Sequence, residues 1–162
     1  MVNKNYKYTL AFIKRGDEVL MLNRNKSPWM GSWNGVGGKE EPNESAIECI
    51  KREVFEETEI NINVNNVFDK GVVTWNTYDS NGLGLHVYLI IVPIEFEYHT
   101  PKVTREGILD WKKISWISDF NNTGVSSNIP YFINDIINEE IRYNHYCEFE
   151  GNVIKKVTKE KI

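Results

Sequence analysis

Two hydrophobic patterns alternate along the chain. Residues 6–14 alternate and are rich in Tyr, Thr, Phe and Ile, and together with 19–23 they predict two strands joined by a short hairpin at 15–18. Apolar residues spaced three and four apart predict helices over 43–57 and 129–142. The remaining alternating segments predict strands over 62–70, 71–78, 85–97, 111–116 and 146–157, with a turn at 79–82.

The order of these elements predicts an α/β fold. Strands and helices are interleaved by short connections, which is typical of a mixed β-sheet covered by helices, an α/β/α sandwich rather than a doubly wound parallel sheet. The 162 residues are 41% hydrophobic and 12% aromatic, enough for one buried core. We therefore expect a single domain over residues 1–162.

The helix at 43–57 carries a cluster of acidic residues. Asn43 is suited to the N-cap position, which would place Glu44 in the first turn. Glu53, Glu56 and Glu57 are three and four positions apart and would share one helix face. Carboxylates in this pattern suit Mg²⁺ or Mn²⁺, which also bridge phosphates, although a solvated acidic face has the same composition. Arg52 can reach back two turns to Glu44 and tie the preceding loop to the helix.

The segment 38–60 resembles the Nudix box, the signature of the Nudix hydrolases. It reads Gly-x5-Glu-x7-Arg-Glu-hydrophobic-x-Glu-Glu-x-x-hydrophobic, beginning at Gly38. The resemblance implies the α/β/α sandwich and a metal-dependent hydrolase. It also implies a metal site of Gly38 (through its carbonyl), Glu53, Glu56 and Glu57, with Glu44 and Arg52 as structural support. One position differs from the family pattern, because Glu59 stands where the family usually has a glycine. That glycine commonly ends the helix in the left-handed conformation, in which any other residue destabilises the fold by roughly 1 kcal/mol.

The residues before the box bear on the substrate. Residues 33–39 resemble the W-N-G-x-G-G-K segment of Nudix enzymes that remove pyrophosphate from oxidised purine nucleoside triphosphates such as 8-oxo-dGTP. The resemblance assigns purine reading to Asn34, whose amide offers both a donor and an acceptor; a turn-forming Asn before Gly is the alternative. Trp29 and Trp33 are candidates for stacking on the base, or ordinary packed aromatics, and Lys39 completes the substrate-binding set.

Two later segments extend the resemblance. Glu106 precedes Trp111 by five residues, as does a family glutamate that supplies a metal ligand or catalytic base from outside the helix. The tail 142–151 is similar to the closing strand of the oxidised-purine enzymes. The loop 121–128, in contrast, lacks the tryptophan and paired aspartates with which the animal enzymes grip the base. Either another residue reads the purine or the base preference differs.

The composition of the chain limits which kinds of binding partner we expect. The net charge is −4 and the isoelectric point about 5.5, which argues against binding to a nucleic-acid polymer but not to a small phosphorylated substrate beside a metal. The longest apolar run, 87–94, is too short for a bilayer, so we expect no membrane association and a cytoplasmic protein, as a monomer or homodimer. Cys49 and Cys147 form no metal-spacing motif and no disulfide framework.

These observations predict a nucleoside triphosphate pyrophosphohydrolase that uses Mg²⁺, or Mn²⁺ as a substitute. Glu53, Glu56, Glu57 and Glu106 are the expected catalytic residues, and either Glu56 or Glu106 would accept the proton of the attacking water. Two alternatives remain: a diphosphate-linked substrate such as ADP-ribose or a dinucleoside polyphosphate, and a non-catalytic nucleotide-binding module. The complete set of box carboxylates argues against the latter.

Overall fold

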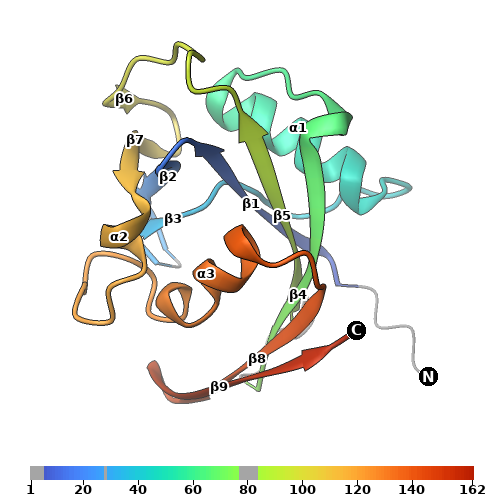
Figure 1. The fold of residues 1–162 in the computed structure, drawn as a ribbon, viewed down its shortest axis with the longest axis vertical. Helices are drawn as coiled ribbons and strands as arrows, with labels where there is room; N and C mark the ends of the chain where they lie inside the picture. The colour runs from blue at the N-terminus through green and yellow to red at the C-terminus, as the bar shows by residue number, and fades with distance from the viewer. Residues whose placement is uncertain (1–5, 28, 77–83) are drawn as a thin grey trace.

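The computed structural model describes residues 6–27, 29–76 and 84–162 (Figure 1). The strands in these residues are β1 (Tyr8–Arg15), β2 (Glu18–Arg24), β3 (Trp33–Asn34), β4 (Val67–Trp75), β5 (Gly84–Val92), β6 (Lys102–Val103), β7 (Gly107–Lys113), β8 (Tyr143–Glu150) and β9 (Val153–Lys161). The helices are α1 (Ala46–Thr58), α2 (Ile114–Ile117) and α3 (Ile129–Asn138), with a 3₁₀ turn at Val64–Asn66.

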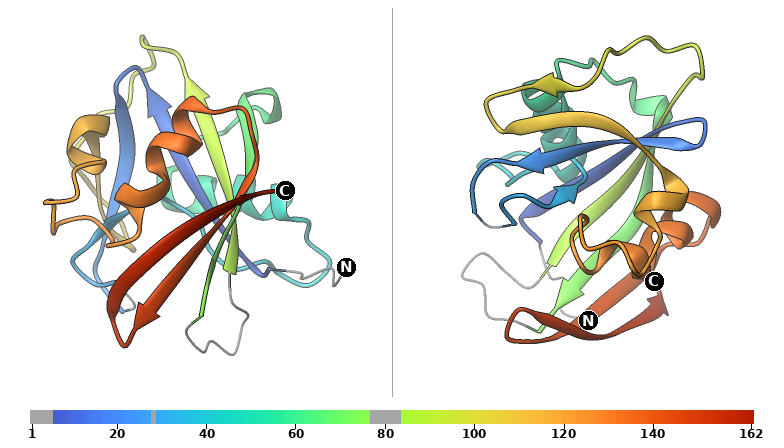
Figure 2. Two further views of the ribbon diagram at one scale, coloured as in Figure 1. Left: turned by 60° about the horizontal axis from the view of Figure 1, so that its bottom comes forward. Right: turned by 90° about the vertical axis from the view of Figure 1, so that its left-hand side faces the viewer.

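The described strands form one mixed sheet in the order β6-β7-β2-β1-β5-β4-β8-β9, with β3 paired to β2. The pairs β1–β5 and β4–β8 are parallel and the other pairs are antiparallel. Figure 2 shows α1 and α3 on opposite sides of this sheet, with the β8–β9 hairpin extending one edge. The predicted α/β/α sandwich with a mixed sheet is confirmed.

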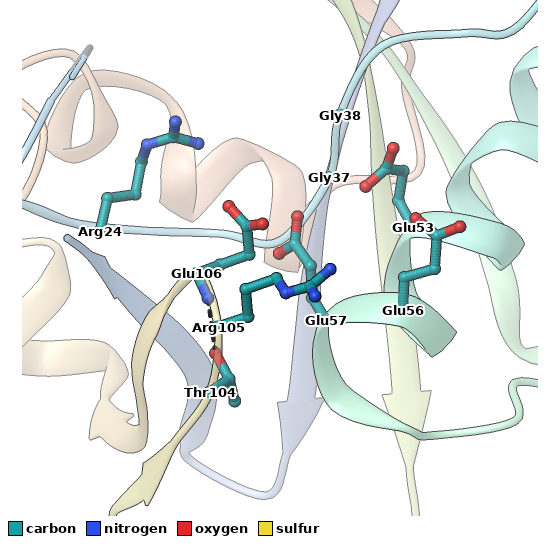
Figure 3. Close-up of a pocket in the computed structure, with 9 residues that line it drawn as sticks. All are labelled: Arg24, Gly37, Gly38, Glu53, Glu56, Glu57, Thr104, Arg105 and Glu106. Carbon is teal, nitrogen blue, oxygen red and sulfur yellow. Dashed lines mark hydrogen bonds between the residues drawn. The ribbon is translucent and has the colours of Figure 1, made fainter. Parts of the chain in front are cut away.

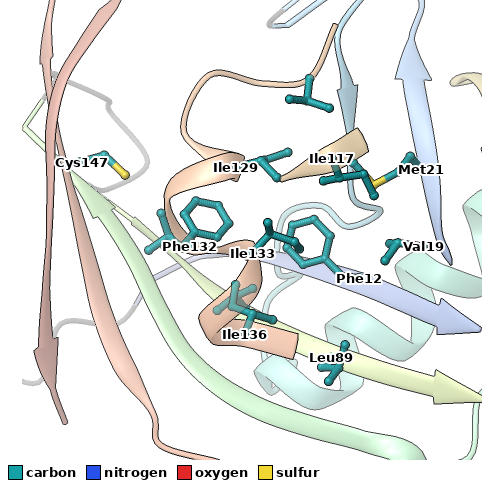
Figure 4. Packing of buried hydrophobic residues seen from close by; sticks show 13 residues of the cluster. Phe12, Val19, Met21, Leu89, Ile117, Ile129, Phe132, Ile133, Ile136 and Cys147 are labelled. Carbon is teal, nitrogen blue, oxygen red and sulfur yellow. The ribbon is translucent and has the colours of Figure 1, made fainter. Parts of the chain in front are cut away.

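Alternation along the central strand β1 divides the core into two clusters. Phe12 points to the α3 side, where it packs with Phe132 of α3 (Figure 4). Its neighbours Ala11 and Ile13 point to the α1 side, against Ile50. Side chains of successive strand residues point to opposite faces, so the period-two pattern of the sequence fills both cores at once. Among the described residues, no helix has the length and apolar character needed to cross a membrane.

Helix α1 begins later than the sequence predicted. Ser45, not Asn43, is the N-cap: its hydroxyl accepts the Glu48 N–H, and the Glu48 side chain accepts the Ser45 N–H. This reciprocal capping box satisfies two helix donors, which Asn43 cannot do from its left-handed conformation (φ 65°). Glu44 therefore lies ahead of the helix rather than in its first turn. At the other end, Glu59 adopts the predicted left-handed conformation, with φ 64°.

Three strand predictions also need correction, and the first is the strand predicted over 85–97, which is β5 and ends at Val92. Residues 62–66 hold a 3₁₀ turn, and β4 runs unbroken across Gly71, where the sequence predicted a boundary between two strands. The register of the β4–β5 pair shifts between Asp69 and Val72, so Gly71 marks a β-bulge. A Cβ at Gly71 would collide with the Tyr143 carbonyl of β8, which explains why glycine stands there.

The C-terminal third differs in its boundaries. The helix predicted over 129–142 ends at Asn138, and the single strand predicted over 146–157 is the hairpin of β8 and β9, which turns at Gly151 with φ 62°. The strand predicted at 111–116 is β7 followed by the short α2. The turn predicted at 79–82 lies outside the described residues.

Candidate active site

A pocket of about 620 Å³ lies between α1, the end of β2 and the turn that precedes β7 (Figure 3). It is lined by Arg24, Gly37, Gly38, Glu53, Glu56, Glu57, Thr104, Arg105 and Glu106. The pocket thus brings together the four predicted glutamates, three from α1 and one from a segment about fifty residues further along.

Two glycines let the loop before α1 pass close to its neighbours. A Cβ at Gly38 would collide with the Glu53 carboxylate, and a Cβ at Gly37 would collide with the Thr9 carbonyl on β1. The Gly38 carbonyl accepts hydrogen bonds from the Thr9 N–H at 2.8 Å and from the Thr9 hydroxyl at 3.2 Å. It would have to give up one of them to bind a metal, because a carbonyl oxygen has two lone pairs.

Glu57 is the most deeply placed carboxylate of the pocket, with 8% of its surface exposed. Burial raises its pKa to about 8, and the nearby Glu53 and Glu106 add to the effect, opposed by the Gly37 N–H that its carboxylate accepts and by Arg24. Its Oε2 is buried and has no hydrogen-bond partner within the described part of the chain. A buried carboxylate oxygen without a partner is costly and indicates a missing cation or donor.

Arg52 joins the loop to the helix face. It donates to both oxygens of Glu44, from Nε at 2.7 Å and from Nη2 at 3.0 Å, so the Glu44–Arg52 pair predicted from the sequence is present. This bond lowers the pKa of Glu44 to about 2, and in return raises that of Arg52. Arg52 also donates to Glu53 at 2.8 Å and to Glu56 at 3.2 Å. One guanidinium therefore counters the repulsion among the carboxylates.

Glu53 and Glu56 differ in environment although both contact Arg52. Burial raises the pKa of Glu53, while its bond to Arg52 opposes the rise. Glu56 keeps 55% of its side chain exposed, at the mouth of the pocket. It is therefore the helix carboxylate that a solvent molecule reaches most easily.

Glu106 enters the pocket from a tight turn and faces Glu57 in Figure 3. The Thr104 hydroxyl accepts the Glu106 N–H at 3.2 Å, and the Thr104 N–H donates to the Gly107 carbonyl. The Glu106 carboxylate lies 3.7 Å from the Lys26 ammonium. The position that the sequence assigned by resemblance is thus on the same pocket as the helix carboxylates.

The donor set suits a hard divalent cation. No three His, Cys, Asp or Glu side chains in the described residues are set close enough to hold an ion as they stand. The buried Glu57 Oε2, however, has no hydrogen-bond partner among those residues and is free to bind a cation. Oxygen donors of this kind are those that Mg²⁺ and Mn²⁺ prefer, so the residues fit such an ion.

The predicted base-reading residues do not share one surface. Asn34 lies opposite Leu22 and Trp33 opposite Asn23 in the β2–β3 pair, so their side chains point to opposite faces of the sheet. The Asn34 Oδ1 accepts the Gly35 N–H at 2.8 Å, which orients its amide.

The two tryptophans and the lysine also differ in placement. Trp33 packs on the α3-side cluster with the Lys112 ammonium 4.3 Å from its ring centre. Trp29 is 42% exposed on the loop before β3. Lys39 is exposed at the surface, and its carbonyl accepts from Arg52. Trp33 therefore has a packing partner already, whereas Trp29 keeps an accessible ring.

The pocket also contains two arginine side chains that were not predicted from the sequence. Arg24 and Arg105 line it beside the four glutamates, and Arg24 Nε is buried without a partner among the described residues. Their positions in the sequence could have suggested a role at the site, because Arg24 directly follows the strand predicted over 19–23 and Arg105 directly precedes Glu106. Pairing of β2 with β7, which the sequence does not state, brings the two together.

The chain matches one family model and is similar to several known proteins. The NUDIX domain model matches residues 6–118. Relatives include the NAD-capped RNA hydrolases NudC of Pseudomonas syringae pv. syringae and Pseudomonas entomophila, 36% and 42% identical over 79 residues. That stretch covers 48% of this chain and only 27% of the relatives' length.

Solved structures show the same fold. The MutT protein from Bacillus halodurans superposes with a TM-score of 0.72 at 22% identity, covering 94% of this chain and 96% of that one. The NUDIX domain of Shewanella oneidensis NrtR, complexed with ADP ribose, gives 0.60 at 17% identity, with 81% and 86% covered. Because the family model matches well over half of its length, the chain belongs to the NUDIX domain family, whose enzymes hydrolyse phosphoanhydride bonds.

Proposed function

We propose that this chain is a metal-dependent hydrolase that splits a nucleoside triphosphate into the monophosphate and pyrophosphate, with oxidised purine nucleotides such as 8-oxo-dGTP preferred. The observation that carries the proposal is the buried Glu57 oxygen without a partner, in a pocket shared with three further carboxylates. Such a set is costly in the folded protein when all four groups are ionised, and a bound cation removes that cost without protonating them.

Glu53 and Glu57 would hold Mg²⁺ or Mn²⁺, with Glu56 and Glu106 able to complete the set. Bound there, a divalent cation supplies a water of lowered pKa and offsets charge on the phosphoryl oxygens. Arg52 keeps Glu53 and Glu56 at fixed positions through its bonds to both.

Glu56 or Glu106 would accept the proton of the attacking water. Glu56 has the more exposed carboxylate, at 55% against 32% for Glu106. The guanidinium groups of Arg24 and Arg105 are placed to pair with phosphate oxygens of the substrate.

The preference for an oxidised purine rests on the segment 33–39 and on Asn34. With its Oδ1 oriented by Gly35, the Asn34 amide can present a donor to a base edge. Because Trp33 is packed against Lys112, we assign stacking to Trp29, whose ring is accessible.

A second candidate is a diphosphate-linked nucleoside, such as ADP-ribose or the dinucleotide cap of NAD-capped RNA. It is favoured by the NudC relatives and by the absence of the tryptophan and paired aspartates from 121–128. If the cap of NAD-capped RNA is the substrate, an RNA end enters the site, and the expectation of no nucleic-acid polymer is wrong.

The test is product analysis by ion-exchange chromatography with Mg²⁺ and, in parallel, 8-oxo-dGTP, dGTP, ADP-ribose and NAD-capped RNA. Monophosphate and pyrophosphate formed fastest from 8-oxo-dGTP support the first candidate, and cleavage confined to the diphosphate-linked compounds supports the second. Glu57→Gln should lower turnover by about a hundredfold or more. Glu148→Gln, an exposed acid on β8, serves as the matched control and should leave turnover unchanged. Near-normal turnover in Glu57→Gln would refute the proposed site.

A further inference from the structure

The turn that carries Glu106 is fastened to the chain that follows β2, not to α1. Asn25 makes two contacts with it: its N–H donates to the Glu106 carbonyl at 3.1 Å, and its Nδ2 donates to the Arg105 carbonyl at 3.1 Å. These bonds continue the β2–β7 ladder, which ends at the pair Arg24–Gly107. Asn25 thus binds the Glu106 turn to the end of strand β2, one residue beyond the last pair of the β2–β7 ladder.

This tie opposes an electrostatic force. Glu53, Glu56, Glu57 and Glu106 line one pocket, so ionised carboxylates among them repel one another across it. Repulsion of this kind pushes Glu106 outward, because Glu106 lies in a turn, whereas the other three carboxylates are held by the helix α1. Losing the Asn25 side-chain bond would let the turn move away from α1.

The next residue, Lys26, acts on the same carboxylate in a different way. Its ammonium lies 3.7 Å from Glu106, with side-chain exposures of 58% and 32%. The pair relieves the repulsion in the protein without metal. A divalent cation bound by Glu106 would meet this positive charge, so Lys26 competes with the metal for the carboxylate.

We propose that Asn25 and Lys26 are positioning residues for Glu106 with opposite effects on the metal: Asn25 holds the carboxylate where it can bind a cation, and Lys26 is the counter-ion that the cation displaces. The inference rests on the proposed function, since it takes Glu106 to be part of the metal site. Once displaced, the Lys26 ammonium is available to the negative charge of the substrate phosphates.

The experiment is a titration of residues 1–162 with Mn²⁺ alone, following free Mn²⁺ by electron paramagnetic resonance, without nucleotide. Lys26→Gln should bind Mn²⁺ about two- to fivefold more tightly, as expected for loss of an exposed counter-ion. Asn25→Ala should bind it about two- to tenfold more weakly, as expected for loss of one hydrogen bond. Both side chains are exposed, so neither change removes core packing.

Two controls separate positioning from general effects. Lys113→Gln removes an exposed lysine that pairs with Asp17 at 3.1 Å, at the far end of β2 and β7, and should leave Mn²⁺ binding unchanged. In a Glu106→Gln background, neither Lys26→Gln nor Asn25→Ala should alter Mn²⁺ affinity further.

The outcomes are distinct. If the wild-type protein binds no Mn²⁺, the metal site and with it the proposed function are overturned. If the wild type binds Mn²⁺ but both variants match it, or both shift in the same direction, the positioning roles are refuted while the proposed function stands. Effects that persist in the Glu106→Gln background would also refute the inference.

Discussion

Replacing Glu59 by glycine should stabilise the protein, although it removes an ion pair. Glu59 ends α1 with φ 64° and ψ 12°, the left-handed region. A side chain there brings Cβ close to the backbone, at roughly 1 kcal/mol relative to glycine. The Glu59 carboxylate also pairs with Lys102 at 3.3 Å, but 78% of the Glu59 side chain is exposed. A pair so open to solvent contributes little.

The conformational gain should therefore exceed the loss of the pair. For a chain of this length, about 1 kcal/mol corresponds to a rise in Tm of about 2–4 °C. The assay is urea and thermal unfolding of the wild type, Glu59→Gly and Glu59→Gln. The glutamine variant keeps the backbone strain and removes only the charge, so it isolates the contribution of the ion pair.

The order of stabilities tests the reasoning. We expect Glu59→Gly to be the most stable, and Glu59→Gln to be equal to the wild type or slightly less stable. A Glu59→Gly variant no more stable than Glu59→Gln would refute the argument, because the left-handed conformation would then cost nothing. Activity should be unchanged in both, since Glu59 does not line the pocket.

Two further predictions concern buried titratable groups. His145 is 1% exposed and its Nε2 has no partner among the described residues; burial lowers its pKa from the ordinary 6.5, with Asp135, Glu139 and Lys159 nearby. The unfolded chain then binds this proton more readily, so the contribution of His145 to the free energy of unfolding should fall as the pH drops below 6.5. Urea unfolding above and below that pH should show that His145→Gln gains stability relative to the wild type at the lower pH, whereas exposed His99→Gln should follow the wild type; parallel curves for all three would contradict this. Cys49 and Cys147 are fully buried, and burial raises the pKa of both thiols to about 11, so a thiol reagent should label them only upon unfolding; rapid labelling of the native protein would show that the packing is wrong.

The local chemistry of the candidate site could be predicted from the sequence. Helical spacing fixed which face of α1 carries Glu53, Glu56 and Glu57, and the predicted pair of Arg52 with Glu44 is present although Glu44 lies in the loop ahead of α1. These relations span a few residues, and helix geometry determines them wherever the helix packs. The correct N-cap was also available locally, because Ser45 and Glu48 form the capping-box pattern.

Contacts between residues of neighbouring strands could not be predicted from the sequence and were found only in the tertiary structure. Pairing of β2 with β7 places Arg24, Asn25 and Lys26 beside Glu106, about eighty residues away. The pattern of alternation specifies which face a side chain takes but not which strand lies next to it. Gly71 shows the same limit. Its position in the sequence suggested a boundary between two strands, but in the structure it forms a β-bulge inside β4, where β8 passes close to it.

The sequence by itself determined that a helix would carry a cluster of carboxylates and an arginine that reaches Glu44. Only the tertiary structure decided which arginines line the pocket with that cluster, that Trp33 packs against Lys112, and that one Glu57 oxygen is buried without a partner among the described residues. The reason is that helix periodicity acts over one or two turns, whereas burial and charge at the pocket depend on strands that the chain brings together from distant positions.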